Sequence, residues 1–275
     1  MKIVHIGYPK TGTKYLQNYV FPHISGINYV DYWDSMAQLE DVFMGTTFEH
    51  KCRRWPTPKE NSLYTSERLV GTPATGVLNY EIALRLKDIG FDRAIIVIRR
   101  QDTMIESLYR QFVQQGSVLT AREFINDSEA FRWMYLDYYN LVDRYVQVFG
   151  CENVLVIPHE KLSRDPVGVS RRIGEFCGGE VENIEDTRRN VSLSYISIKL
   201  LRIINHFTWN TFRRSQIISD HITTWKARQV LIFFDPLLRR LSKKKFFGID
   251  LSRYFISNRK LDETYRLDLK KYGYY

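Results

Sequence analysis

Short apolar runs alternate with stretches of helical periodicity through the first two thirds of the chain. The apolar runs that predict strands are residues 2–6, 27–30, 62–67, 94–98 and 153–157. The periodic stretches that predict helices are residues 34–45, 77–90, a segment from about Asp102, 132–149 and 167–177. Runs of this kind are typical of parallel strands buried between helices. The alternation predicts an α/β fold with a parallel sheet and right-handed crossovers.

The last third of the chain has a different pattern. A polar loop is predicted over 179–194, followed by helices at 195–212 and 225–241 that mix large apolar residues with arginine and lysine. We expect a single domain over 1–275 that consists of two parts. The two parts are a nucleotide-binding α/β core at 1–178 and a helical extension at 179–275 whose end packs back on the core.

Composition narrows the class of protein. The chain has 275 residues, 44% hydrophobic and 26% charged, which is typical of a globular domain. We find no apolar run long enough for a spanning helix, and a core strand at the start leaves no room for a signal peptide. Cys52, Cys151 and Cys177 lack metal-ligand spacing and suggest reduced thiols, so a cytoplasmic protein is expected. The net charge of +9 is consistent with an anionic partner, which would be nucleic acid, lipid, or an anionic donor and acceptor, and equally with a basic solvated surface.

The turn after the first strand carries the clearest chemistry. Residues 7–14 read GYPKTGTK, and a helical pattern follows. Unpaired N–H groups at such a loop and helix start favour an anion, and Lys10 and Lys14 add positive charge. Gly7 and Gly12 have the spacing of a nucleoside triphosphate loop, but Thr13 stands in the usual lysine place. The sequence predicts a phosphate site that differs from the standard one.

The segment YPKTGT closely resembles the 5′-phosphosulfate loop of sulfotransferases that use 3′-phosphoadenosine 5′-phosphosulfate (PAPS). The resemblance implies that Lys10, Thr11, Gly12, Thr13 and Lys14 bind the donor. Lys14 departs from the threonine or serine usual in the family. The resemblance further implies a P-loop NTPase-like central parallel sheet flanked by helices, with the nucleotide at the carboxyl ends of the strands.

A second segment resembles the 3′-phosphate signature of the same family. Arg99 closes the predicted strand 94–98, and Ser107 follows eight residues later on a predicted helix. Two anion sites flanking one nucleotide are what a 3′,5′-bisphosphate requires, and the planar fork of arginine binds phosphate oxygens in pairs. The usual R-N-P-x-D is here R-R-Q-D-T, which leaves the role of Asp102 open.

Three later segments extend the resemblance. Residues 159–166 resemble a structural turn of sulfotransferases, with His159 in the aromatic place; a role for His159 as catalytic base is the alternative. Residues 257–261, SNRKL, resemble the closing segment of bacterial and carbohydrate sulfotransferases. The resemblance also makes Arg188 and Arg189 candidates for a loop over the nucleotide, with a solvated linker as the alternative.

The resemblance implies a reaction, in which a sulfuryl group moves in line from PAPS to an acceptor and 3′,5′-ADP (PAP) leaves. Lys10 is expected to stabilise the departing phosphate oxygen. Glu67, at the end of a strand, is the candidate base, as in heparan-type sulfotransferases, with a salt bridge to Arg68 or Lys10 as the alternative. No metal is expected. The acceptor is expected to be a carbohydrate or another hydroxyl-bearing molecule.

Two other functions stay open on the sequence alone: a P-loop nucleotide kinase or other phosphoryl-transfer enzyme, and a non-catalytic module that binds a polyanion or a membrane. Residues 195–247 have three interpretations, which are helices packed on the domain, a peripheral membrane contact, and a groove for an anionic polymer. No nucleic-acid partner is expected.

Overall fold

The computed structural model describes residues 1–44, 57–71, 79–182, 184, 193–207, 221–241 and 244–275. The chain divides into two compact units. Unit 1 comprises Met1–Gln101, Arg132–Arg189 and Leu251–Tyr275, and unit 2 comprises Asp102–Phe131 and Asn190–Asp250. These units do not follow the boundary expected at residue 178, and that boundary stays a prediction.

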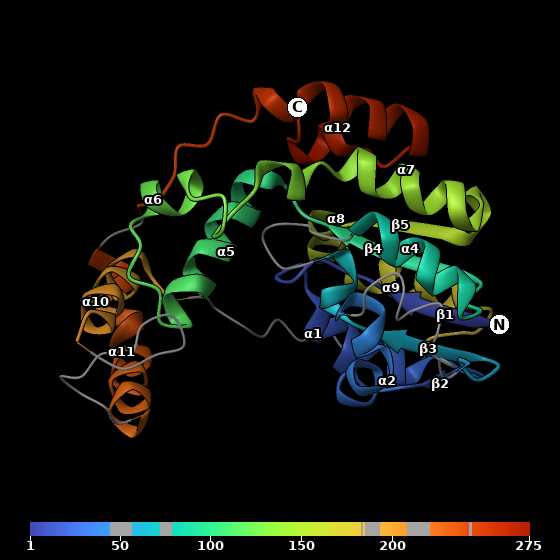
Figure 1. The fold of residues 1–275 in the computed structure, drawn as a ribbon, viewed down its shortest axis with the longest axis horizontal. Helices are drawn as coiled ribbons and strands as arrows, with labels where there is room; N and C mark the ends of the chain where they lie inside the picture. The colour runs from blue at the N-terminus through green and yellow to red at the C-terminus, as the bar shows by residue number, and fades with distance from the viewer. Residues whose placement is uncertain (45–56, 72–78, 183, 185–192, 208–220, 242–243) are drawn as a thin grey trace. The chain divides into compact units, whose positions relative to one another are not determined.

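Unit 1 contains a five-stranded parallel sheet in the order β2-β3-β1-β4-β5 (Figure 1). The strands are β1 (Lys2–His5), β2 (Asn28–Tyr29), β3 (Ser62–Thr65), β4 (Arg93–Ile98) and β5 (Val154–Pro158). Val4 of the central strand pairs with Tyr64 on one side and Ala94 on the other. The carboxyl ends of β1, β3 and β4 therefore lie at one edge of the sheet, where ligands bind in open α/β sheets. The predicted α/β fold is confirmed.

Helices cover the sheet of unit 1. After β1 the chain forms α1 (Thr13–Tyr15), a π-helical turn at Leu16–Val20 and a 3-10 turn at Phe21–His23; the others are α2 (Tyr32–Met44), a 3-10 turn at Glu67–Val70, α4 (Asn79–Asp88), a 3-10 turn at Trp133–Leu136, α7 (Tyr138–Phe149), a 3-10 turn at Cys151–Asn153, α8 (His159–Arg164), α9 (Pro166–Cys177), α12 (Ser252–Tyr265) and a 3-10 turn at Leu269–Tyr272. Leu16 and Val20 share one buried cluster with Ile173 of α9 and Ile95 of β4. This cluster fixes the segment that follows β1 against the sheet.

The single helix predicted for 132–149 is interrupted at Asp137. Asp137 leaves the helical conformation (φ −79°, ψ 84°), and its carboxylate accepts a hydrogen bond from the backbone N–H of Asn140 at the start of α7. Asp137 is thus an N-cap, a position that an acidic side chain favours because it satisfies an otherwise unpaired N–H. The aromatic periodicity runs through this break, so the sequence pattern hides it.

The closing segment of the chain is part of unit 1. Tyr254 of α12 donates a hydrogen bond to the carbonyl of Trp133, at 2.8 Å. Asn258 is fully buried, donates to the carbonyl of Tyr274 at 2.9 Å, and accepts from Gln101 at 2.8 Å. Because both the donor and the acceptor of this buried amide have partners, Asn258 holds the closing segment in a single conformation.

Unit 2 is helical in its described residues. It holds most of α5 (Gln101–Gln114), together with α6 (Ala121–Asn126), α10 (Tyr195–Asn205) and α11 (His221–Leu241). Asp235 of α11 accepts hydrogen bonds from Ser194 N at 2.6 Å and Ser197 Oγ at 2.5 Å, which joins α11 to α10. Among the described helices, none combines the length and the apolar character needed to cross a membrane.

Candidate active site

The loop between β1 and α1 has an unusual backbone. Lys10 has φ +67° and Gly12 has φ +87°, both in the left-handed region. For a lysine this conformation is uncommon and costs about 1–3 kcal/mol, a strain found most often at functional sites. The Thr11 hydroxyl donates to the carbonyl of Tyr8 at 2.6 Å and holds the turn closed. Alternation of left-handed and right-handed residues turns backbone N–H groups toward one concavity, which suits an anion.

Glu67 lies at this loop. It follows β3 directly, at the start of the 3-10 turn Glu67–Val70, and β3 is the parallel neighbour of β1. The carboxylate accepts a hydrogen bond from the Thr13 side chain, and Lys10 and Lys14 are close enough to influence its charge. The pairing of β1 with β3 therefore brings Glu67 to the phosphate loop, two features that the sequence predicted separately.

Burial has the largest influence on the pKa of Glu67. Burial raises the pKa of the Glu67 carboxyl above its usual value, while the Thr13 hydrogen bond and the charges of Lys10 and Lys14 lower it in part. The net shift is upward. A carboxylate whose pKa moves toward neutrality is a better general base than an ordinary surface glutamate.

Arg99 reaches the same loop from β4. Its Nη1 donates to the carbonyl oxygen of Lys10 at 2.8 Å. The Tyr138 hydroxyl donates to the carbonyl of Arg99 at 2.6 Å and so fixes the tip of β4 from the other side. Lys10 and Arg99 thus lie together at the carboxyl edge of the sheet.

A buried aromatic group supports the loop from beneath. The Tyr8 ring packs edge-on against Tyr135 and Tyr138, with centroid distances of 4.9 and 5.1 Å, and the Tyr8 hydroxyl donates to the carbonyl of Tyr135 at 2.8 Å. Burial raises the pKa of Tyr8 and of Tyr138 far above the usual value, so both stay neutral. These tyrosines form the floor of the loop.

His5 is a site-supporting residue that the sequence reasoning missed. It is fully buried at the end of β1, and its Nδ1 lies 2.9 Å from Thr65 Oγ1 at the end of β3. Burial lowers the pKa of His5 to about 3. A β-carbon on Gly7 would come within 2.4 Å of His5 Nε2, so the loop needs glycine there. The sequence signal that could have identified His5 is a histidine inside an otherwise apolar strand.

His159 packs on the outside of the loop. A β-carbon on Gly12 would lie 3.4 Å from His159 Nδ1. Burial and the charge of Arg99 lower the pKa of His159 to about 4. Such a group is neutral at physiological pH and a weak base, which favours the structural interpretation of the turn at 159–166.

Three predicted site residues are not placed with these groups. Ser107 is nearly buried on α5 and belongs to unit 2, so its pairing with Arg99 stays a prediction. Arg188 and Arg189 lie outside the described residues. Over the part of the chain that the structure describes, no cluster of histidine, cysteine, aspartate or glutamate has the make-up of a metal site.

Comparison with known proteins identifies the family. The family model of the sulfotransferase domain matches residues 1–223. A sulfotransferase from Alicyclobacillus acidocaldarius is similar in fold: the TM-score is 0.53 at 20% identity, over 74% of this chain and 95% of that one. A mouse sulfotransferase complexed with PAP gives a TM-score of 0.41 at 17% identity, over 95% of this chain and 81% of that one.

No curated protein gives a significant match to the chain. The family model, by contrast, covers both predicted phosphate motifs and the strand that leads to Glu67. The chain belongs to the sulfotransferase family and is a PAPS-dependent sulfotransferase that acts on a hydroxyl-bearing acceptor.

Proposed function

We propose that the protein transfers the sulfuryl group of PAPS to a hydroxyl of a carbohydrate or glycoconjugate. The observation that carries the proposal is the position of Glu67, whose carboxylate accepts a hydrogen bond from Thr13 of the phosphate loop. A glutamate at this strand end is the base in heparan-type sulfotransferases, which the sequence resembles at this position. The choice of a carbohydrate acceptor depends on that likeness.

At the donor end, Lys10 and the loop stabilise charge. The bond between sulfur and the bridging phosphate oxygen breaks, and negative charge grows on that oxygen. The Lys10 ammonium and the backbone N–H groups of residues 11–14 are the donors proposed for it. Because the Thr11 hydroxyl already donates to Tyr8, Thr11 contributes its backbone N–H.

At the acceptor end, Glu67 takes the proton. The acceptor oxygen forms its bond to sulfur as its hydroxyl proton passes to the Glu67 carboxylate. The raised pKa of Glu67 increases its affinity for that proton, and the nearby charges of Lys10 and Lys14 favour the ionised form.

The other end of the nucleotide is assigned to Arg99. Its guanidinium lies at Lys10, where Nη1 donates to the Lys10 carbonyl, and a planar guanidinium suits the oxygens of a phosphate. We propose that Arg99 binds the 3′-phosphate together with Ser107, and that Arg188 and Arg189 close over the nucleotide. A peripheral membrane contact through residues 195–247 is also proposed.

Donor binding is tested by thermal unfolding with PAP and, separately, with ATP and Mg²⁺. A ligand at about 100 times its dissociation constant adds ~2.7 kcal/mol to the free energy of unfolding. We expect stabilisation by PAP. Stabilisation by ATP with Mg²⁺ alone would favour the kinase alternative, and salt-sensitive polyanion binding without a PAP response would favour the binding module.

Acceptor class is tested with sulfur-labelled PAPS and two sets of acceptors, one of oligosaccharides and one of simple phenols. We expect labelled oligosaccharides that depend on Glu67. Label found only on phenols would overturn the carbohydrate proposal and leave sulfuryl transfer intact.

A further inference from the structure

Helix α11 in unit 2 exposes a continuous apolar stripe. Its members recur at helical spacing, which places them on one face. They are Val230, Phe233, Phe234, Leu237 and Leu241, and their exposed fractions are 54%, 76%, 50%, 58% and 69%. We call these five residues the α11 stripe. An apolar patch of this kind on a soluble domain marks an interaction site more often than a neutral surface.

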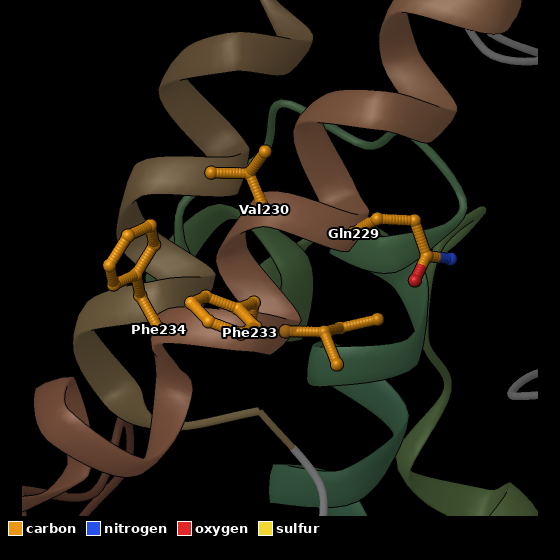
Figure 2. Close-up of a pocket in the computed structure, with 5 residues that line it drawn as sticks. Gln229, Val230, Phe233 and Phe234 are labelled. Carbon is orange, nitrogen blue, oxygen red and sulfur yellow. The ribbon is translucent and has the colours of Figure 1, made fainter.

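The stripe is distinct from the face that α11 uses for packing. Leu231 and Asp235 lie on the opposite side and are buried, and Asp235 bonds to Ser194 and Ser197 of α10. The side chains of the stripe therefore lie outside the packed core of unit 2. Figure 2 shows Val230, Phe233 and Phe234 around a shallow groove whose lining also includes Gln229.

Positive charge lies at the carboxyl end of the stripe. Arg240, on the same helical face as Phe233 and Leu237, is exposed, as are Lys244 and Lys245 just beyond the helix. In the sequence from residue 221 to residue 248 the one acidic residue is Asp235, and it is buried against α10. Among the described residues of this stretch, the exposed charged side chains are therefore cations.

The basic segment is held by the aromatic residue that follows it. The Phe246 ring packs on Tyr109 and Tyr195, with centroid distances of 4.9 and 4.5 Å, and the Phe246 backbone N–H donates to Glu106 at 3.0 Å. Phe246 is therefore an anchor inside unit 2. Lys244 and Lys245 are kept near the end of α11 by this anchor.

We infer that the α11 stripe, with Arg240, Lys244 and Lys245, binds the headgroup region of an anionic lipid bilayer. Apolar side chains enter the boundary between headgroups and acyl chains, and the cations pair with anionic headgroups. A second copy of the chain is a poorer occupant, because each copy carries a net charge of +9, whereas an anionic surface attracts it. The inference is independent of the chemistry at Glu67 and specifies the surface within residues 195–247.

The test is co-sedimentation of the full-length protein with vesicles. One set contains phosphatidylcholine only, and the other contains two parts phosphatidylcholine to one part phosphatidylglycerol. We expect binding to the anionic set that weakens as salt rises, because headgroup attraction is screened. The variant Phe233→Gln/Leu237→Gln should bind at least ~10-fold more weakly, and Arg240→Glu/Lys245→Glu should lose the preference for phosphatidylglycerol.

The matched control is Ile256→Gln on α12, which removes an 85% exposed apolar side chain from unit 1. It should bind vesicles as the parent protein does. Equal binding by the Phe233→Gln/Leu237→Gln variant, or no preference for anionic vesicles, would overturn the inference. A dimer lost in that variant would assign the surface to a second copy instead. Stabilisation by PAP is measured on every variant. Loss of vesicle binding with PAP stabilisation intact can then be distinguished from loss of donor binding.

Discussion

Arg99 and Lys10, 89 residues apart in the chain, meet at a hydrogen bond of 2.8 Å between the Arg99 guanidinium and the Lys10 carbonyl. The contact joins the tip of β4 to a loop residue in a strained left-handed conformation. The hydrogen bond also directs the Lys10 carbonyl toward the Arg99 cation. The backbone N–H groups of the loop are then left to bind an anion. One residue from each of the two predicted anion-binding segments thus takes part in this hydrogen bond.

Arg99→Lys should weaken PAP binding. Lysine keeps the charge but lacks the planar fork that can hold both the Lys10 carbonyl and a phosphate. A hydrogen bond to a charged group contributes about 1.5–3 kcal/mol, so the dissociation constant should rise roughly 10- to 100-fold by titration calorimetry. The control is Arg100→Lys, since Arg100 donates to the carbonyl of Tyr272 in the closing segment. Equal weakening in both variants would refute the assignment.

Glu67→Gln should abolish most turnover and spare donor binding. Glutamine retains an oxygen that can accept from Thr13 but cannot take a proton, so kcat should fall by ~10²–10⁴ while the dissociation constant of PAP is unchanged. Steady-state sulfuryl transfer and calorimetry measure the two quantities. The control is Glu60→Gln, an exposed glutamate that binds the N-terminus and Lys2. Full activity in Glu67→Gln would remove Glu67 from the mechanism.

Lys14→Thr should move the acid side of the pH–rate profile to higher pH. The Lys14 charge lowers the pKa of Glu67, so its removal lets the pKa rise further, and Glu67 stays protonated to a higher pH. A base must be deprotonated to act, hence kcat/KM should begin to fall at a higher pH as the solution is acidified. Lys14→Arg keeps the charge and should leave the profile in place. Identical profiles for the threonine and arginine variants would show that Glu67 is not the titrating base.

Stability should decline below pH 6.5 because of two buried histidines. The pKa of His5 is lowered to about 3 and that of His159 to about 4, from 6.5 in the unfolded chain. Between those values the unfolded chain binds protons that the folded chain does not, so the free energy of unfolding falls as pH falls. Each histidine contributes at most ~1.4 kcal/mol per pH unit, until pH passes its folded pKa.

Urea unfolding across this range, in the parent protein and in His159→Tyr, measures the effect. Tyrosine restores an aromatic ring without a group that titrates in acid, so the slope should decrease between pH 6.5 and about 4. His23→Gln replaces an exposed histidine and should leave the slope as it is. A parent protein whose stability is flat over this range would contradict the burial of both rings.

Residues close together in the chain are enough to predict the sheet and the loop. Strands such as 94–98 are continuous apolar runs, and the turn at 7–14 has its own glycines, so both are specified by residues close together in the chain. Arg99 was predictable for the same reason, since it directly follows its strand. The break at Asp137 was not, because aromatic periodicity continues across it and only the capping hydrogen bond reveals it.

Contacts between distant segments determine which of these residues meet. Glu67 reaches Thr13, and His5 reaches Thr65, because β1 and β3 are parallel neighbours, and no local pattern encodes the order of strands in a sheet. The sequence left three interpretations of residues 195–247 open, and it did not show which face of α11 packs; burial of Leu231 and Asp235 identifies that face. Local preferences fix elements, whereas burial and pairing between distant segments fix the pKa of Glu67 and the surface left for a partner.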